Sequence, residues 1–361
     1  MAIYLINLFS LLLWQAIYQK MPKTQKSKLI IMTLIFVQFV LIQGLRDYSV
    51  GIDTANYVKY YNAFSHKDFF HMLAHPQYVF EVGYMILMYV CKNLGVPTRM
   101  FIIIVAIIIN FLYFRFIYKE SNDFVLSLWL FICMEYFTLS FTTYRQIIAM
   151  GFIVNSFIYL KDDKYLKFSI FVLLAASFHK SALIFVIVPI IKFIYRLIDE
   201  RSKIGKFLVL NRFALASLAI VILIFIKPLI IDVVTKLYPN YSAGGELGML
   251  FFEILVVLFA TLMCEHLTEE KTKLRFYQLF ILLSTCVQYC TTIFFMINRV
   301  TLYFYVFSIV GIPYCLYLVK DMRTRRIFLM AILLLSFIEY YYVTMDMYNV
   351  VPYVLGDFTI H

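Results

Sequence analysis

The sequence of 361 residues is poor in charge, in glycine and in proline. Only 15% of its residues are charged and 63% are hydrophobic, whereas a soluble globular domain carries roughly 25% charged and ~45–50% apolar residues. This composition excludes an ordinary cytosolic fold, and it equally excludes disordered, collagen-like and coiled-coil chains. The 11 glycines and 8 prolines are few for a transporter built from broken helices.

The signatures of soluble enzymes are also missing. The sequence contains no P-loop, no GxGxxG and no GxSxG. Its six cysteines form no CxxC pair and lie in or beside apolar stretches, which favours buried free thiols. The net charge of +11 comes from short basic clusters between apolar runs. Such clusters are typical of membrane loops rather than of a nucleic-acid groove, so no nucleic-acid partner is expected.

Long apolar runs dominate what is present. A helix that spans a bilayer needs ~20 mostly apolar residues, and the runs predict an all-α, polytopic membrane protein with about twelve transmembrane helices in a single domain over residues 1–361. The first run has no basic segment before it and is interpreted as a retained span rather than a signal peptide. The predicted spans are residues 2–18, 29–45, 100–118, 124–142, 146–160, 165–178, 181–198, 213–231, 249–264, 276–297, 302–319 and 327–343.

One further run, residues 79–94, is short and carries Glu81. The lysine and arginine clusters at 20–28, 161–167, 192–206 and 320–326 all face the cytoplasm only if this run does not cross the membrane. We therefore predict that it is a re-entrant or surface element, with both termini outside. The outer loops are then 46–99 and 232–248. Backbone that fails to span needs protein or water around it, which suggests an outer cavity.

Polar residues of a particular kind gather on this outer side. Each alone has a simpler interpretation, because an arginine can anchor a helix at the interface and an aspartate can cap one. Asp53 is expected to cap a helix that carries Tyr57 and Tyr61 on one side. Ionisable groups facing a bundle interior usually mark a substrate path, however, and so many on one side favour a site. The outer residues are Arg46, Asp53, Tyr57, Glu81, Arg145, Gln146, His179, Lys180, Glu253 and Arg299.

Two other features carry weaker hypotheses. Glu135 lies deepest in an apolar run and is expected to pair locally. His66, His71 and His75 raise a metal hypothesis, since the last two are four residues apart and can share a helix face. Nothing else in the sequence supplies a matching ligand set, so we interpret them as exposed loop histidines. Neither a metal nor a cofactor is predicted.

Four short motifs occur in order over residues 46–184: RDYSVGIDTANYVKYYNAF, Glu81-Val82-Gly83-Tyr84, TYRQIIAMGF and FHKSAL. Together they resemble the EpsG family of bacterial exopolysaccharide proteins, which are Wzy-like polymerases of capsule and exopolysaccharide clusters. The C-terminal half resembles the family in its span layout and in Asn298-Arg299, which precedes a tyrosine-rich span.

This resemblance implies a reaction and a place. Wzy-type polymerases join oligosaccharide repeat units carried on undecaprenyl diphosphate, on the outer face of the bacterial cytoplasmic membrane. The growing chain moves from its lipid diphosphate onto a sugar hydroxyl of the next lipid-linked unit. The fold expected is similar to that of GT-C-type membrane glycosyltransferases. Membrane lipid, and a flippase and a chain-length regulator of the same pathway, are the other partners expected.

The resemblance also suggests roles for matching residues. Arginine binds phosphate oxygens in pairs and keeps its charge, so Arg145 and Arg299 are expected to clamp the diphosphate, with His179 donating a hydrogen bond or proton. Such fixed positive groups can replace a divalent metal, so the reaction is expected to be metal-independent. Asp53 or Glu81 would act as base or orienting carboxylate. The remaining substrate-binding candidates are Arg46, Thr54, Tyr57, Gln146, Lys180 and Glu253.

Three alternatives stay open. A flippase or other transporter would need charged residues through the whole membrane thickness, which the sequence does not favour. A ligase of the O-antigen type would use the same fold and donor with another acceptor. A non-catalytic subunit of a polysaccharide machine would tolerate replacement of Arg145 or His179, whereas a catalyst would not.

Overall fold

The structure, a computed structural model, describes residues 1–65, 70, 80–197, 228, 249–264, 267–268, 271–292, 297–346 and 348–356. Within these residues every regular element is a helix, and the only β contact is an isolated bridge between Arg46 and Leu355. The predicted all-α class is therefore confirmed. Of the earlier predictions, the span at 213–231 (apart from Pro228), the loop at 232–248 and the three loop histidines His66, His71 and His75 lie outside the described residues.

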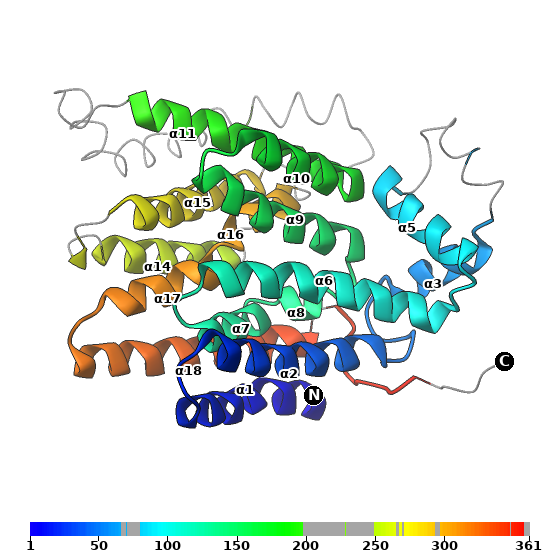
Figure 1. The fold of residues 1–361 in the computed structure, drawn as a ribbon, viewed down its shortest axis with the longest axis horizontal. Coiled ribbons are helices and arrows are strands. Elements are labelled where there is room, and N and C mark those ends of the chain that lie inside the picture. Colours follow the sequence, from blue (N-terminus) through cyan, green and yellow to red (C-terminus); the bar gives the residue numbers. More distant parts are fainter. Residues whose placement is uncertain are drawn as a thin grey trace.

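The helices pack side by side with their long axes roughly aligned (Figure 1). In chain order they are α1 (Ala2–Lys20), α2 (Gln25–Gly44), α3 (Thr54–Ala63), α5 (Val82–Asn93), α6 (Thr98–Glu120), α7 (Phe124–Cys133), α8 (Tyr136–Leu139), α9 (Tyr144–Lys161), α10 (Tyr165–Phe178), the 3-10 helix η1 (Lys180–Val186), α11 (Ile187–Leu197), α14 (Met249–Met263), α15 (Lys271–Cys290), α16 (Asn298–Tyr305), α17 (Ser308–Leu318) and α18 (Met322–Asp346).

Several helices have the length and composition of membrane spans. Among the described residues five are long and apolar enough to cross: α1, α2, α6, α18 and the combined segment Asn298–Leu318. Shorter apolar helices occur at Phe124–Cys133, Tyr165–Phe178 and Glu253–Leu262. The protein is thus a multi-pass membrane protein. The predicted number of about twelve spans is not reached among these helices, because several predicted spans are short or broken.

The clearest break corrects the predicted span 124–142. Helix α7 ends at Cys133, and Glu135 then adopts a left-handed backbone with φ 67°. The Glu135 amide donates to the Ile132 carbonyl at 3.1 Å, so the last turn tightens before the chain leaves the helix. The predicted span 181–198 likewise starts as η1 before α11. Apolar composition is continuous across both breaks, which is why hydropathy alone merges the pieces.

The two ends of the bundle differ in chemistry. At one end the start of α1, the end of α2 and the C-terminal tail lie together: the Tyr4 hydroxyl donates to the Val350 carbonyl at 2.7 Å, and the Gly356 amide donates to the Leu45 carbonyl at 2.8 Å. At the other end Lys28 donates to the Tyr118 carbonyl at 2.9 Å. We call the first the loop end and the second the lysine end. The N-terminus and the described end of the C-terminal tail, up to Gly356, lie at the loop end (Figure 1).

Basic residues hold the lysine end together. Lys161 pairs with the buried carboxylate of Glu120 at 2.7 Å, and Lys273 donates to the Glu120 carbonyl at 3.3 Å. Buried Lys192 reaches Asp163 at 2.9 Å. Two of the predicted cytoplasmic clusters, 20–28 and 161–167, thus occupy the same end, which is the arrangement that the positive-inside rule requires.

Helices α3 and α5 lie at the loop end, beside the bundle rather than through it (Figure 1). The residue before α5, Glu81, faces the start of α9. The chain just after α5 is tied to α3, because the Tyr61 hydroxyl donates to the Val96 carbonyl at 2.7 Å. Both ends of α5 therefore meet the same end of the bundle. This is the position expected of the predicted non-crossing element, and its placement outside the membrane stays a prediction.

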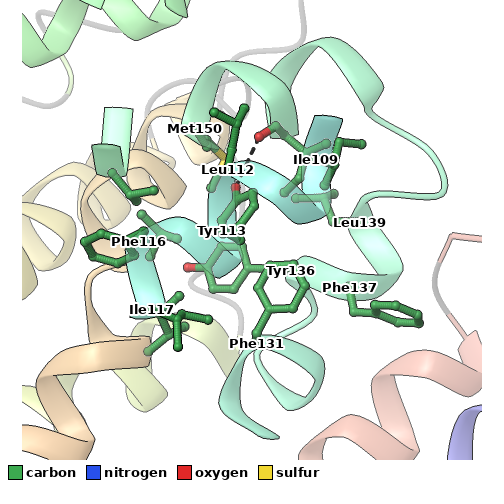
Figure 2. Packing of buried hydrophobic residues seen from close by; sticks show 14 of the residues in the cluster. Ile109, Leu112, Tyr113, Phe116, Ile117, Phe131, Tyr136, Phe137, Leu139 and Met150 are labelled. Atoms are coloured by element: carbon green, nitrogen blue, oxygen red, sulfur yellow. Dashed lines mark hydrogen bonds between the residues drawn. The ribbon is translucent and has the colours of Figure 1, made fainter. Parts of the chain in front are cut away.

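The core beneath the loop end is aromatic and tightly packed around α6. Tyr113 of α6 is fully buried and packs against Phe131 of α7 and residues of α8 and α9 (Figure 2), whereas Phe116, also fully buried, packs on Phe307. A series of buried hydrogen bonds crosses this core: Asn110 donates to Gln43, and Gln43 donates to Ser140 at 2.6 Å. Interhelical hydrogen bonds of this kind hold membrane helices in register. The turn that carries Ser140 is thereby fixed to α2 and α6.

The two ends of α10 provide a test of orientation. Lys180 and Lys164 are exposed and flank this helix on the loop end and the lysine end. In a cysteine-free background, Lys180→Cys should react with an impermeant maleimide on intact cells, and Lys164→Cys only after the membrane is opened. Labelling of both positions from the same side would show that α10 does not cross.

Candidate active site at the loop end of the bundle

A buried arginine organises the loop end. The Arg46 side chain is 1% exposed, and its guanidinium donates to the carbonyls of Gln43, Val50 and Phe141 and to the Tyr144 hydroxyl. It also lies over the Phe141 ring at 4.5 Å. All of these partners belong to the protein itself. The geometry gives Arg46 a structural role between the 46–53 loop and the 140–144 turn, and substrate binding by it stays a prediction.

The VGxDT motif packs directly against the same turn. Gly51 has φ +97°, and a Cβ there would collide with the Phe141 carbonyl and stand 2.8 Å from the Thr54 hydroxyl. That hydroxyl lies 2.8 Å from both the Val50 and Phe141 carbonyl oxygens. Only glycine combines a left-handed backbone with so close an approach. Thr54 is fully buried, so its described contacts are also structural.

Asp53 immediately precedes α3, as predicted, but its carboxylate makes no capping hydrogen bond. The capping part of the prediction is therefore wrong, and the half-buried carboxylate stands without that partner. Tyr57, one turn later, is buried and stacks on Tyr144 at 4.4 Å. Burial raises the pKa of the Tyr57 hydroxyl, while contact with Arg145 lowers it and Asp53 raises it further. Asp53 and Arg145 thus approach the same tyrosine.

Arg145 and Glu81 form an ion pair across the start of α9 and the start of α5. Their side chains are 22% and 13% exposed, so the pair is partly open rather than sealed. The guanidinium also lies over the Phe80 ring at 4.8 Å, and the Lys180 amide donates to the other Glu81 oxygen at 3.4 Å. The ion pair fixes where the arginine fork sits.

His179 lies between α10 and η1, next to this pair. Burial lowers its pKa to about 4; Arg145 and Arg299 lower the pKa as well, and Glu81 opposes them. The imidazole is therefore neutral at pH 7. It can donate one hydrogen bond or accept a proton, but it does not carry the extra proton that the predicted proton donation requires.

Arg299 completes the cluster from α16. Its side chain is exposed and acts electrostatically on His179. Gln146 donates to the Arg299 backbone carbonyl at 3.1 Å, which ties the start of α16 to the start of α9. Gln146 is therefore a link between the two arginine-bearing helices. The structure thus brings together Asp53, Tyr57, Glu81, Arg145, Gln146, His179 and Arg299, and we call this set the arginine–histidine site.

Two residues of the site were not predicted. Ser181 lies 2.5 Å from His179 Nδ1, and its hydroxyl donates to that of Tyr303 at 3.2 Å. Tyr303 is fully buried in α16. The sequence contained a signal for each, since Ser181 belongs to the FHKSAL motif and Tyr303 to the tyrosine-rich span. A hydroxyl has too many structural uses to be assigned without coordinates.

Glu253 lies elsewhere. Its carboxylate accepts a hydrogen bond from Tyr305 at 2.5 Å and meets Glu339, with Glu135 nearby. None of the described groups that act on it belongs to the arginine–histidine site. Glu135, which was expected to pair locally, instead accepts a hydrogen bond from Tyr348, 213 residues later in the chain, at 3.1 Å. The Lys180 side chain is exposed and only its amide touches the site, so binding by Glu253 or Lys180 stays a prediction.

The carboxylates and the histidine of the site do not form a metal-ligand group. Among the residues that the structure describes, no group of three or more histidine, cysteine, aspartate or glutamate side chains is arranged to hold a metal ion. Two guanidinium groups, those of Arg145 and Arg299, instead act electrostatically on His179. Such a set attracts an anion with several oxygens, such as a phosphate ester.

A multi-pass helical membrane protein with a cationic site at one end of its bundle is the class that fold and site define. Within this class, the model of the EpsG family matches residues 4–355. The chain belongs to the EpsG family. No curated protein and no solved structure matches it.

The fit of Gly51 against the Phe141 carbonyl generates a prediction about stability. Gly51→Ala should destabilise the protein by roughly 1–3 kcal/mol, because a strained backbone and a collision add up. Gly95 also has a positive φ, +69°, but a Cβ there would meet nothing within 4 Å. Gly95→Ala is therefore the matched control and should cost about 1 kcal/mol. Thermal unfolding of both variants in detergent measures the difference. Equal decreases in melting temperature would show that the predicted collision does not contribute.

Proposed function

We propose that this protein is a glycosyltransferase that polymerises lipid-linked oligosaccharide repeat units. Membership of the EpsG family indicates an exopolysaccharide-polymerase-like membrane protein. The observation that carries the proposal is that Arg145 and Arg299 both act on the half-buried His179, with Glu81 paired to the first arginine. Transfer from a sugar diphosphate needs fixed positive charge where the leaving phosphate gains electrons.

The reaction follows from these charges. A hydroxyl oxygen of the acceptor unit attacks the anomeric carbon of the donor sugar, and a new carbon–oxygen bond forms. The bond from that carbon to the diphosphate oxygen breaks, and its electron pair stays on the diphosphate. Arg145 and Arg299 neutralise the charge that develops there. The hydroxyl proton passes to a base in the site.

The state of each carboxylate bears on that last step. Glu81 is engaged by Arg145 and by the Lys180 amide, so it serves first to hold the arginine in place. Asp53 makes no capping bond and stands beside Tyr57, which contacts Arg145. Of the two predicted carboxylates, Asp53 is therefore the one left to orient the acceptor sugar.

The surroundings proposed for this reaction follow from the lipid carrier. The donor and the acceptor are undecaprenyl-diphosphate-linked oligosaccharides in the bacterial cytoplasmic membrane, and the site faces outside because the lysine end takes the cytoplasmic side. A flippase would deliver the units and a chain-length regulator would limit the product. An O-antigen-type ligase would use the same donor chemistry with another acceptor, and product analysis separates the two.

One observation favours a second function. Helix α7 breaks at Glu135, and this residue, Glu253 and Glu339 lie together inside the bundle. Carboxylates beside a broken membrane helix are typical of transport sites. A lipid-linked oligosaccharide transporter would therefore depend on this glutamate group rather than on the arginine–histidine site.

Replacement of Arg145 separates these functions. Arg145→Ala should lower polymer formation at least about 100-fold while single lipid-linked repeats accumulate, because a leaving-group donor is lost. Arg145→Lys keeps the charge but not the fork and should retain part of the activity. Arg323→Ala, an exposed change at the lysine end, is the control and should leave polymer unchanged. Lipid and polymer analysis of complemented cells gives the readout; normal polymer from Arg145→Ala would end the proposal.

Treatment with a chelator tests whether arginines, rather than a metal ion, neutralise the diphosphate. If two guanidinium groups neutralise the diphosphate, purified protein in lipid nanodiscs should polymerise at the same rate before and after treatment with excess EDTA. Inactivation that added Mg²⁺ or Mn²⁺ reverses would show that a divalent ion takes part.

A further inference from the structure

The side of His179 that faces the protein is held by two hydroxyl groups. Its Nδ1 lies 2.5 Å from the Ser181 oxygen and 3.4 Å from the Tyr303 oxygen. The Ser181 hydroxyl in turn donates to the Tyr303 oxygen at 3.2 Å. Two of these contacts, those of Ser181 and His179 with Tyr303, therefore join the start of η1 to the buried face of α16.

The arrangement of these hydrogen bonds favours one position for the imidazole proton. A serine hydroxyl has one hydrogen, and Ser181 uses it toward Tyr303. The short contact between Ser181 and His179 then needs a hydrogen on Nδ1, which donates to the serine oxygen. A neutral imidazole has only one N–H, so Nε2 keeps its lone pair. Among the described residues, Nε2 has no hydrogen-bond partner.

We propose that Ser181 and Tyr303 are positioning residues that hold His179 with Nδ1 protonated, so that Nε2 receives the proton of the attacking sugar hydroxyl. This inference rests on the proposed polymerase function and deepens it, because it assigns the base. The O–H bond of the acceptor breaks, its electron pair forms the bond to the anomeric carbon, and its proton forms the Nε2–H bond. The product imidazolium donates through both nitrogens.

The charged groups around His179 explain how donor binding would raise its pKa. From α9 and α16 it faces Arg145 and Arg299, and from the start of α5 it faces Glu81. Lys180 is its chain neighbour and Tyr303 contacts it from α16. Burial and the two arginines keep the free protein's pKa for His179 at about 4. A bound diphosphate offsets the arginine charges, so donor binding raises this pKa and turns a weak base into a competent one.

The first experiment reads the proton position without turnover. Full-length protein labelled with 15N-histidine in nanodiscs, with the His179 signal assigned through His179→Asn, should show an Nδ1-protonated neutral ring at pH 7. Ser181→Ala should shift the signal toward the other tautomer, whereas Ser177→Ala, whose hydroxyl bonds its own helix at Leu174, should not. Addition of undecaprenyl diphosphate should raise the titration midpoint by at least ~1 pH unit. An Nε2-protonated ring, or no upward shift, overturns the inference.

The second experiment measures turnover. Ser181→Ala and Tyr303→Phe should lower kcat about 10-fold or more with KM unchanged and should alter the pH profile, because the base is misoriented while substrate contacts stay. Ser181→Thr, which restores the hydroxyl, should recover most of the loss. Tyr305→Phe, on the same helix but bonded to Glu253, should keep the wild-type pH profile.

The two experiments separate the inference from the function beneath it. The expected tautomer in a protein that forms no polymer would refute the polymerase and leave the hydrogen-bond assignment intact. Normal polymerisation with unchanged kcat and pH profile in both Ser181→Ala and Tyr303→Phe would refute the positioning role and leave the polymerase intact.

Discussion

The loop end of this protein depends on one buried cation. Arg46 has no carboxylate partner among its described contacts and instead gives its hydrogens to three backbone carbonyls and the Tyr144 hydroxyl. Each buried carbonyl in a membrane protein needs a donor, and a guanidinium supplies several from one side chain. Because the 140–144 turn leads directly into α9, this interaction also sets where Arg145 emerges. A structural arginine thereby positions the arginine that we propose binds the diphosphate.

The charged groups of the arginine–histidine site interact with one another. An unpaired guanidinium at a half-buried position would be costly, and Glu81 offsets that cost while it directs the fork of Arg145. Burial, together with the two arginines that we propose bind the diphosphate, lowers the pKa of His179. In the proposed mechanism His179 is therefore a weak base in the free protein, and a bound anion would raise its pKa.

Helix α16 separates two polar regions of the interior. Tyr303 faces His179, whereas Tyr305, two residues later, bonds Glu253 in the glutamate group. A two-residue step on a helix turns a side chain to nearly the opposite face. The cationic site and the acidic group are thus distinct, although both depend on one short helix. The sequence pattern places Glu253 with the arginines because all of these residues lie near helix ends. In the structure, however, Glu253 and the arginines lie on different faces of α16.

The sequence by itself determined the helical membrane class, the family and most residues of the arginine–histidine site, because apolar run length and short motifs can be read along the chain. The start of α3 after Asp53 and the bounds of α10 followed from the same patterns. Only the tertiary structure decided which arginine is structural, since Arg46 and Arg145 differ in their surroundings and not in their chemistry. It also decided the break at Glu135 and the roles of Ser181 and Tyr303, because hydrogen bonds between distant segments leave no periodic trace along the chain.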